Sequence, residues 1–98
     1  MALKLALRVH DDDNVATLFA NDTAAGSWVD VRDKRGSTER IRVNNPVPYG
    51  HKLAVTDIPV GKSIKKYGEE IGVATKAIQK GDHVHVHNLD SMRGRGDL

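Results

Sequence analysis

Short runs in which apolar and polar residues alternate recur along the chain. Residues 3–9 alternate in this way, and so do residues 29–32 and 40–43, on either side of a turn at 33–37. A period of two places successive side chains on opposite faces of an extended chain, so these runs predict a strand followed by a hairpin. A further short strand is predicted at 51–55, after a proline-containing loop.

Residues 14–20 depart from this alternation. Val15, Ala16, Leu18 and Phe19 are spaced more like one face of a helix than like a strand. Asp13 or Asn14 can cap the start of a helix, so the pattern predicts one short helix near 14–20. The three consecutive aspartates before it are interpreted as a solvated turn rather than as a metal site.

A turn pattern occurs three times, at 22–29, 57–64 and 77–84. Each copy contains a glycine, which can adopt a positive φ in a tight turn, and each leads into a predicted strand. The glycines are 35 and 20 residues apart. Because these spacings are unequal, the pattern predicts one compact β fold that reuses a turn, not a repeat solenoid.

The most unusual segment is 81–89, which reads Gly-Asp-His-Val-His-Val-His-Asn-Leu. Interpreted as one strand, it places His83, His85 and His87 on one face and Val84 and Val86 on the other. Residues on one face of a strand are about 6.5–7 Å apart, so two rings could converge on a metal ion or a carboxylate. The alternative is a solvated polar face on an edge strand.

The composition narrows the class of protein. The 98 residues predict a single small domain, taken here as 1–90 followed by a flexible tail at 91–98. Cysteine is absent, which excludes disulfides and thiolate metal sites and fits a reducing compartment. No apolar run is long enough to cross a membrane or to form a signal peptide, so we expect a cytoplasmic protein. The net charge of +2 and basic clusters without interleaved aromatic residues argue against nucleic-acid binding.

Four ordered segments, which together cover roughly residues 5–90, resemble the N-terminal domain of the altronate and galactarate dehydratase family. They are Val9-His10-x-x-Asp13-Asn14-Val15-Ala16, Gly50-His51-Lys52-Leu53-Ala54 with Asp57-Ile58-Pro59-x-Gly61, Ile64-Lys65-Lys66-Tyr67-Gly68-x-x-Ile71-Gly72-x-Ala74-Thr75, and Gly81-x-x-Val84-His85-Val86-His87-Asn88-Leu89. This resemblance implies a mainly β, SAF-type β-clip domain with short strands.

The resemblance also implies a function. It implies the small subunit or N-terminal domain of a sugar-acid hydro-lyase, inactive alone, that eliminates water from an aldonate or aldarate together with a large catalytic chain. The product would be a 2-keto-3-deoxy acid. Two alternatives stay open: a small subunit of a sulfolactate sulfo-lyase, whose leaving group is sulfite, and a non-catalytic carbohydrate-binding or assembly module. Self-association into a homo-oligomer is also left open.

Elimination requires a base for the α-proton, a cation near the carboxylate, and an acid or metal for the leaving group. The histidines are the residues best suited to this work near neutral pH. His51, His85 and His87 are the catalytic candidates. His85 and His87 are also the candidate ligands of a divalent metal, Fe(II) or Mn(II) ahead of Zn(II). His83 is given less weight, because the resemblance does not require histidine there.

Four further residues are candidates for substrate binding: Lys52, Tyr67, His10 and Asn88. Each has a structural alternative. Lys52 could be a solvated surface charge, and Tyr67 could be a packing ring in a turn. Asn88 could cap the strand end by bonding nearby backbone, and His10 could belong to an ion-paired turn.

Overall fold

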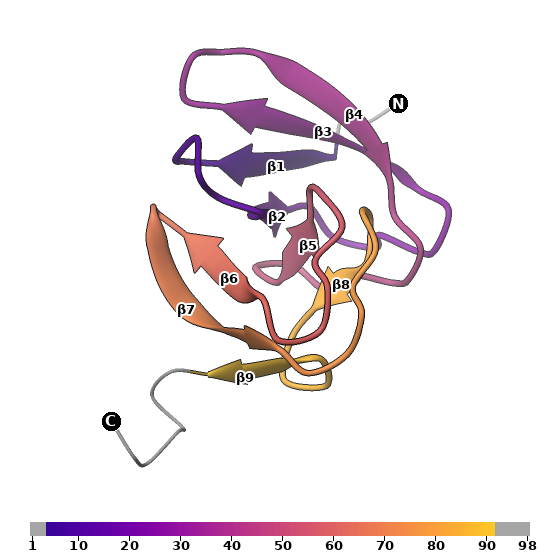
Figure 1. The fold of residues 1–98 in the computed structure, drawn as a ribbon. Helices are drawn as coiled ribbons and strands as arrows, with labels where there is room; N and C mark the ends of the chain where they lie inside the picture. Colours follow the sequence, from indigo (N-terminus) through magenta and orange to yellow (C-terminus); the bar gives the residue numbers. More distant parts are fainter. Residues whose placement is uncertain (1–3, 92–98) are drawn as a thin grey trace.

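The computed structural model describes residues 4–91, which form nine short strands and no helix (Figure 1). The strands are β1 (Leu5–Arg8), β2 (Val15–Phe19), β3 (Trp28–Asp33), β4 (Thr38–Arg42), β5 (Lys52–Ala54), β6 (Ser63–Lys66), β7 (Glu69–Ala74), β8 (His83–Val84) and β9 (Leu89–Ser91). The mainly β fold predicted from the alternating runs is confirmed, as is the hairpin, which is β3–β4. In residues 4–91 no helix is long and apolar enough to cross a membrane.

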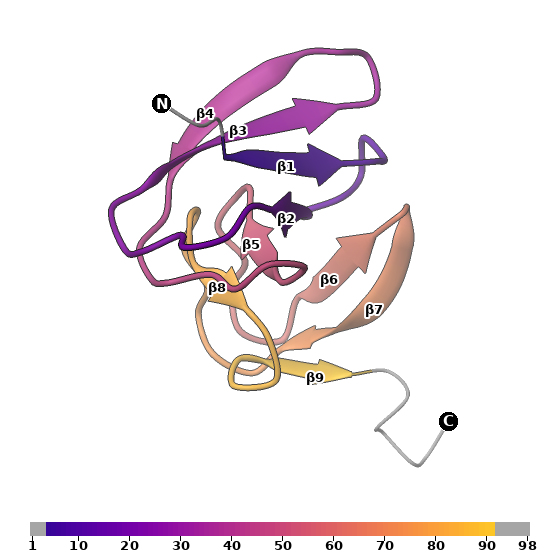
Figure 2. The ribbon, with the colours of Figure 1, turned by 180° about the vertical axis from the view of Figure 1, so that it is seen from behind.

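The strands form two curled sheets. The larger has the order β4-β3-β1-β2-β5-β8, in which β1 and β3 are parallel and every other pair is antiparallel. The smaller has the order β6-β7-β9. Figures 1 and 2 show the smaller sheet beside the β2–β5–β8 end of the larger one. This arrangement agrees with a β-clip.

Four equivalent turn–strand units organise the backbone: 23–28, 47–52, 58–63 and 78–83. Each contains a glycine with positive φ, at Gly26 (87°), Gly50 (81°), Gly61 (83°) and Gly81 (93°). The residue after each glycine donates its N–H to the carbonyl three residues earlier, over 2.9–3.1 Å. Three of these units match the predicted turn pattern. The fourth, at 47–52, lies where the sequence pattern predicts an ordinary loop followed by a strand.

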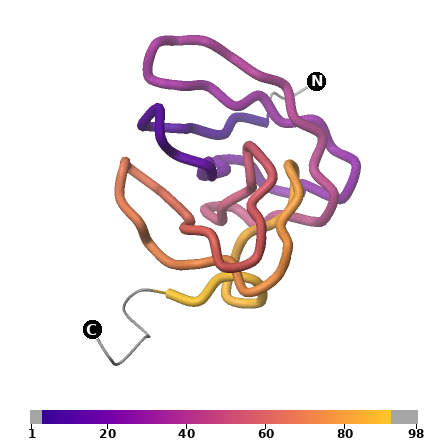
Figure 3. Tube along the Cα trace, in the orientation of Figure 1, coloured from indigo at the N-terminus to yellow at the C-terminus, as the bar shows by residue number. Residues whose placement is uncertain are grey.

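The four units form two similar halves. The amides of Gly26 and Gly61 both bond across the base of a hairpin, to Val43 and Ala74 respectively. The isolated bridges Thr23↔Val47 and Ile58↔Ile78 then connect the units in pairs. In Figure 3 the turns of the two hairpins, β3–β4 and β6–β7, both lie on the left. The spacings of 35 and 20 residues seen in the sequence are unequal because the first of them passes over the fourth unit, at Gly50.

Two apolar cores stabilise the domain, and β2 and β5 contribute to both. In β2, Ala16 and Leu18 belong to the larger core and Val15 to the smaller. In β5, Leu53 belongs to the larger core and Ala54 to the smaller. These strands are therefore covered on both faces, as central strands are.

The predicted helix near 14–20 is wrong, because this segment is β2. Val15, Ala16 and Leu18 are almost fully buried, on opposite faces of the strand. A strand buried on both faces carries apolar residues without strict alternation, which is why the spacing resembled a helix.

The prediction of one strand at 81–89 is also wrong. Pairing in the larger sheet ends after β8, residues 86–88 form a turn, and β9 joins the smaller sheet. Val86, predicted to be an apolar counterpart of Val84, is 77% exposed. The predicted tail at 91–98 lies outside the described residues, except for Ser91, which ends β9.

Candidate functional site

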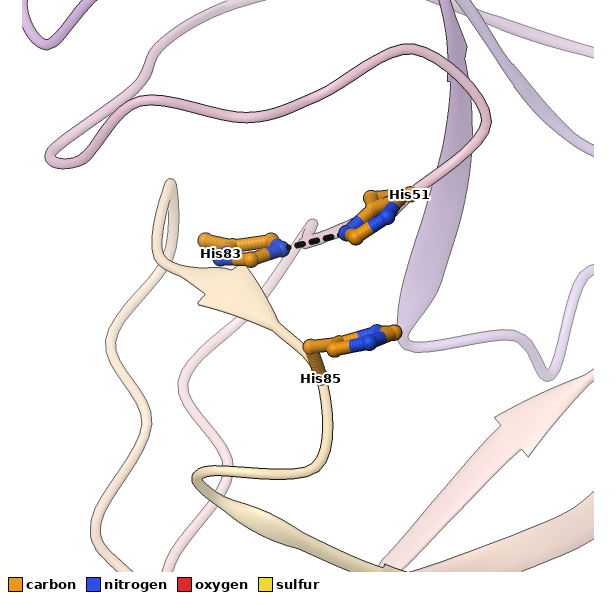
Figure 4. Close-up of side chains that lie close together, drawn as sticks. All are labelled: His51, His83 and His85. Carbon is orange, nitrogen blue, oxygen red and sulfur yellow. Dashed lines mark hydrogen bonds between the residues drawn. The ribbon is translucent and has the colours of Figure 1, made fainter.

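Three histidines from distant parts of the chain converge in the structure (Figure 4). His51 lies directly before β5, His83 begins β8, and His85 follows β8. The antiparallel pairing of β5 with β8 sets Leu53 opposite His83, which brings the two segments together. One ring nitrogen from each histidine lies within 4.8 Å of the others. We call His51, His83 and His85 the histidine centre.

The rings of the histidine centre contact one another directly. His51 Nδ1 and His83 Nε2 are 2.9 Å apart and share a hydrogen bond. The His51 and His85 rings stack with their centroids 4.2 Å apart. His87 is more exposed and lies outside the group, although its ring is 5.1 Å from that of His83.

The surroundings lower the pKa values of two of the three histidines, His83 and His85. The pKa of His83 is lowered to about 4, first by burial and then by the neighbouring His87, His51, His85 and Lys52, in that order. The pKa of His85 is also lowered, by burial and then by His51, Lys52 and His87. Both effects disfavour a positive charge. The two rings therefore offer free lone pairs, which can bind a metal ion or accept a proton.

The histidine centre can hold a metal ion. Metal–imidazole bonds are about 2.0–2.1 Å long, so two nitrogens bound to one ion are at most about 4.2 Å apart. The three nitrogens lie within 4.8 Å of one another, so ring rotations that draw them closer would let all three bind one ion. An all-imidazole set suits Fe(II) and Zn(II).

Asn88, a candidate for substrate binding, is 6% exposed and its side chain contacts the backbone. Its Oδ1 accepts the N–H of His85 at 3.0 Å, and its Nδ2 donates to the carbonyl of His83 at 2.9 Å. These bonds close the turn that follows β8. The structure therefore gives Asn88 the contacts expected of a cap, and these contacts hold His83 and His85 in place.

Lys52 borders the histidine centre. It is half-buried, follows His51, and pairs with Val84, which lies between His83 and His85 in the sequence. Its pKa is lowered by burial and, to a smaller extent, by Lys66.

The structure brings His10 and Tyr67 together, but at the β6–β7 turn rather than in the histidine centre. A Cβ atom on Gly68 would lie 2.9 Å from the ring of His10, so the imidazole packs closely on this turn. Tyr67 is 58% exposed and has a positive φ of 57°.

Sequence reasoning gave too little weight to His83 and missed Asp13. Asp13 is 2% exposed, and its carboxylate accepts the amides of His10 (3.1 Å), Tyr67 (3.0 Å) and Gly68 (2.7 Å). The alternation of 83, 85 and 87 already pointed to His83. For Asp13 no local pattern separates the buried aspartate from its two exposed neighbours.

Comparison with known proteins identifies the family. Residues 4–92 match the family described as the altronate/galactarate dehydratase SAF domain. The chain belongs to this family. The resemblance seen in the sequence is therefore confirmed.

Relatives of two kinds match the chain. The (2R)-sulfolactate sulfo-lyase subunit alpha of Chromohalobacter salexigens is 37% identical over 90 residues, which are 87% of this chain and 93% of that protein. The altronate dehydratase of Escherichia coli is 40% identical over 99 residues, or 94% of this chain and 19% of that protein. The galactarate dehydratase (L-threo-forming) of the same organism is 38% identical, with 80% of this chain and 14% of that protein covered. The chain thus spans less than a fifth of either dehydratase.

Proposed function

We propose that this domain is the small SAF component of a lyase that acts on a hydroxy acid, together with a large catalytic chain. The observation that carries the proposal is the convergence of His51, His83 and His85 in a chain of this family. The matched relatives are named as two dehydratases and a sulfo-lyase subunit. The reaction we favour is loss of water from an aldonate or aldarate, giving a 2-keto-3-deoxy acid.

The histidines have properties that suit proton transfer in an elimination. His85, kept neutral at pH 7 by its lowered pKa, is able to accept a proton from the carbon next to the carboxylate. His51, hydrogen-bonded to His83, has its ring held in place and can return a proton to the leaving group. His87, exposed beside His83, is a further proton donor at the rim.

As the alternative to this direct proton transfer, we propose that His51, His83 and His85 together hold a divalent metal, for which their three imidazoles favour Fe(II) or Zn(II). Bound there, the metal would supply Lewis acidity toward the substrate carboxylate or the leaving hydroxyl. Lys52, beside these rings, would add a positive charge for the acid group of the substrate. His10 and Tyr67 would contact the substrate only at its far end, whereas Asn88 would act by holding His83 and His85.

A second candidate function is the small subunit of a sulfo-lyase, in which sulfite leaves instead of water. This candidate is favoured by the sulfo-lyase alpha subunit, of which 93% aligns with this chain. A third is a non-catalytic assembly or carbohydrate-binding module. A cytoplasmic location completes the proposal, since a chain without cysteine fits a reducing compartment.

The test is to isolate the chain together with the large chain that it binds in its source cells, and to assay the complex for elimination. Formation of 2-keto-3-deoxy acids from aldonates and aldarates, and release of sulfite from sulfolactate, distinguish the two lyase candidates. We expect no turnover by the small chain alone, and turnover by the complex. The double variant His51→Gln/His85→Gln should reduce turnover at least about 100-fold, while Lys76→Gln, on an exposed loop, should not.

Size-exclusion chromatography would show whether the double variant still forms the complex. Full turnover by an intact complex that contains this variant would refute a chemical role for the histidines. The assembly module would then be the correct function.

A further inference from the structure

None of the four aromatic side chains of this chain lies in either apolar core. Phe19 is 42% exposed, Trp28 55%, Tyr49 57% and Tyr67 58%. Aromatic side chains bury a large apolar surface when they are covered, so a small domain that kept them inside would be more stable for it. Rings left in water are instead typical of surfaces that contact another protein, where Tyr, Trp and Phe are enriched.

Three of these rings share one face of the larger sheet. Trp28 lies on the same side of β3 as Asp30, which is paired with Leu5 of β1. Leu5 is in turn paired with Phe19 of β2, and paired residues point to the same side of a sheet. The Tyr49 ring meets the Phe19 ring edge to face, with their centroids 6.0 Å apart. We call this surface the open face; its members are Leu5, Leu7, Thr17, Phe19, Trp28 and Tyr49.

The smaller sheet covers only part of this side of the larger one. At the covered end, Val15 of β2, Ala54 of β5 and Val84 of β8 belong to the smaller core. Val15 lies on the same side of β2 as Phe19, whereas Leu18 faces the larger core. One face of β2 is therefore buried at Val15 and exposed at Phe19. Figures 1 and 2 show the β1–β3 part of the sheet extending beyond the smaller sheet.

A hollow borders the open face at the end of β1. Its volume is about 110 Å³, and Leu7, Val9 and Arg32 are among the residues that line it. Leu7 and Val9 are 36% and 42% exposed, so the hollow presents apolar surface to water. Protein interfaces commonly pair exposed aromatic anchors on one side with such hollows, each filled by a side chain of the partner.

The remainder of a lyase is the body that suits this face. Only 19% of the altronate dehydratase of Escherichia coli aligns with this chain, so about four fifths of that relative lies outside the domain. The relative from Chromohalobacter salexigens, of which 93% aligns, is itself named a subunit. In addition, Tyr49 lies two residues before His51. A large chain bound to the open face would therefore be next to the histidine centre.

The charge around the open face argues against a second copy of this chain. Pairing of β3 with β4 sets Arg42 opposite Trp28 and Arg40 opposite Asp30, and Arg32 lies on the same side of β3. Asp30 is already bonded to Arg40, over 3.3 Å. We call Arg32, Arg40 and Arg42 the arginine rim. Two copies that met through their open faces would bring like charges together, whereas a partner with acidic residues would complement them.

We propose that the open face is the docking surface for the large catalytic chain, with Phe19, Tyr49 and Trp28 as apolar anchors and the arginine rim around them. This inference rests on the proposed function and goes beyond it by naming the surface and the chemistry of its partner. The partner surface is apolar at its centre, fills the hollow at Leu7 with one side chain, and carries carboxylates opposite the arginine rim.

The test measures the affinity of the purified large chain for variants of the full small chain, by calorimetry. Tyr49→Asp and Val60→Asp form a matched pair, because Tyr49 and Val60 precede the glycines of two equivalent turns and are 57% and 61% exposed. Val60 belongs to the unit that leads into the smaller sheet. We expect Tyr49→Asp to weaken binding at least about 30-fold and Val60→Asp less than about twofold.

Two further variants separate the anchors from the arginine rim. Phe19→Asp should weaken binding as much as Tyr49→Asp does, mainly through faster dissociation. Arg32→Glu should slow association and reduce its dependence on salt, with dissociation little changed. Amide NMR spectra of each free variant would check that its fold is retained, which the exposure of all three side chains leads us to expect.

Three results would overturn the docking surface: equal affinity of Tyr49→Asp and Val60→Asp, no large chain bound by wild type, or a dimer of the small chain that Tyr49→Asp dissociates. The outcome is separate from that of the proposed function, because binding is measured without turnover. A complex that turns over and binds both variants equally would remove only the docking surface. A complex that shows the expected affinities and no turnover would remove only the lyase role.

Discussion

The turn–strand units at 47–52 and 78–83 can be compared directly with those at 23–28 and 58–63, because the backbone of all four makes the same glycine turn. The units at 23–28 and 58–63 lead into β3 and β6, each of which is one arm of a hairpin. The units at 47–52 and 78–83 lead into β5 and β8, which pair with each other. His51 and His83 lie at this junction, whereas Ser27 and Lys62 occupy the positions in the hairpin units that correspond to His51. The candidate chemistry thus arises where two copies of one turn meet.

The largest effect is expected from alanine at the glycine of one junction unit. A Cβ on Gly81 would lie 2.5 Å from the carbonyl oxygen of Arg42, whereas a Cβ on Gly50 would have no atom within 4 Å. Both positions have positive φ. We expect Gly81→Ala to lower the free energy of unfolding by about 3–4 kcal/mol, from strain plus overpacking. Gly50→Ala should cost only about 1 kcal/mol, from strain alone.

Urea denaturation of both variants would measure this difference. An equal loss of unfolding free energy in Gly81→Ala and Gly50→Ala would contradict this prediction. It would show that the close contact of Gly81 with the end of β4 does not affect stability.

The next effect concerns metal affinity. Replacing any one of His51, His83 or His85 by Gln removes one of three ligands, and should weaken metal binding about 100-fold, or about 2.7 kcal/mol. His10→Gln makes the same chemical change away from the histidine centre and should weaken binding less than about twofold. Calorimetric titration with Mn(II) or Zn(II) would check this. If His10→Gln lost as much metal affinity as His51→Gln, the ion would not be bound at the histidine centre.

Removal of the Asn88 side chain should have an intermediate effect. Asn88→Ala leaves the buried N–H of His85 and the carbonyl of His83 without their partner, at a cost of about 2 kcal/mol in unfolding free energy. Asn45→Ala is the control, because exposed Asn45 accepts the N–H of His83 where water can replace it. The control should lose less than about 1 kcal/mol. Equal losses would show that burial of Asn88 does not matter.

The smallest effect is a pH dependence of stability in the metal-free chain. The pKa of His83 is about 4 in the folded state, below its ordinary value of 6.5. The unfolded chain therefore binds more protons between these values, so stability falls as the pH drops from about 6.5 to about 4. After allowance for solvent screening we expect a loss of about 1 kcal/mol. The loss should be smaller in His83→Gln, where only His85 still has a lowered pKa, when denaturation is followed with a chelator present. A loss of equal size in this variant would contradict the assignment.

The sequence predicted local structure well where one face of a strand is buried. The β3–β4 hairpin followed from alternation on both arms and a turn containing Gly36. The fourth turn could also have been found, since Pro48-Tyr49-Gly50 repeats the arrangement of Pro59-Val60-Gly61. β2 was missed because both of its faces are buried, so alternation is lost.

The candidate site could be predicted only in part, because long-range pairing assembles it. His51 and His83 are 32 residues apart and meet only through the pairing of β5 with β8, which no local pattern encodes. The sequence favoured His85 with His87 as the metal pair, whereas the nitrogens that converge are those of His51, His83 and His85. His87 lies in the exposed turn after β8, and although its ring is near that of His83, its nitrogens are not among those that converge.

The most direct test of the account is a titration of the full chain with Zn(II) and then with Fe(II) or Mn(II), followed by NMR of the histidine side chains. The account predicts that the ring signals of His51, His83 and His85 change together and saturate at one ion per chain, while His10 is unaffected. Rings that do not respond, or changes confined to His10 and His87, would contradict the claim that two copies of one turn build a metal centre where they meet.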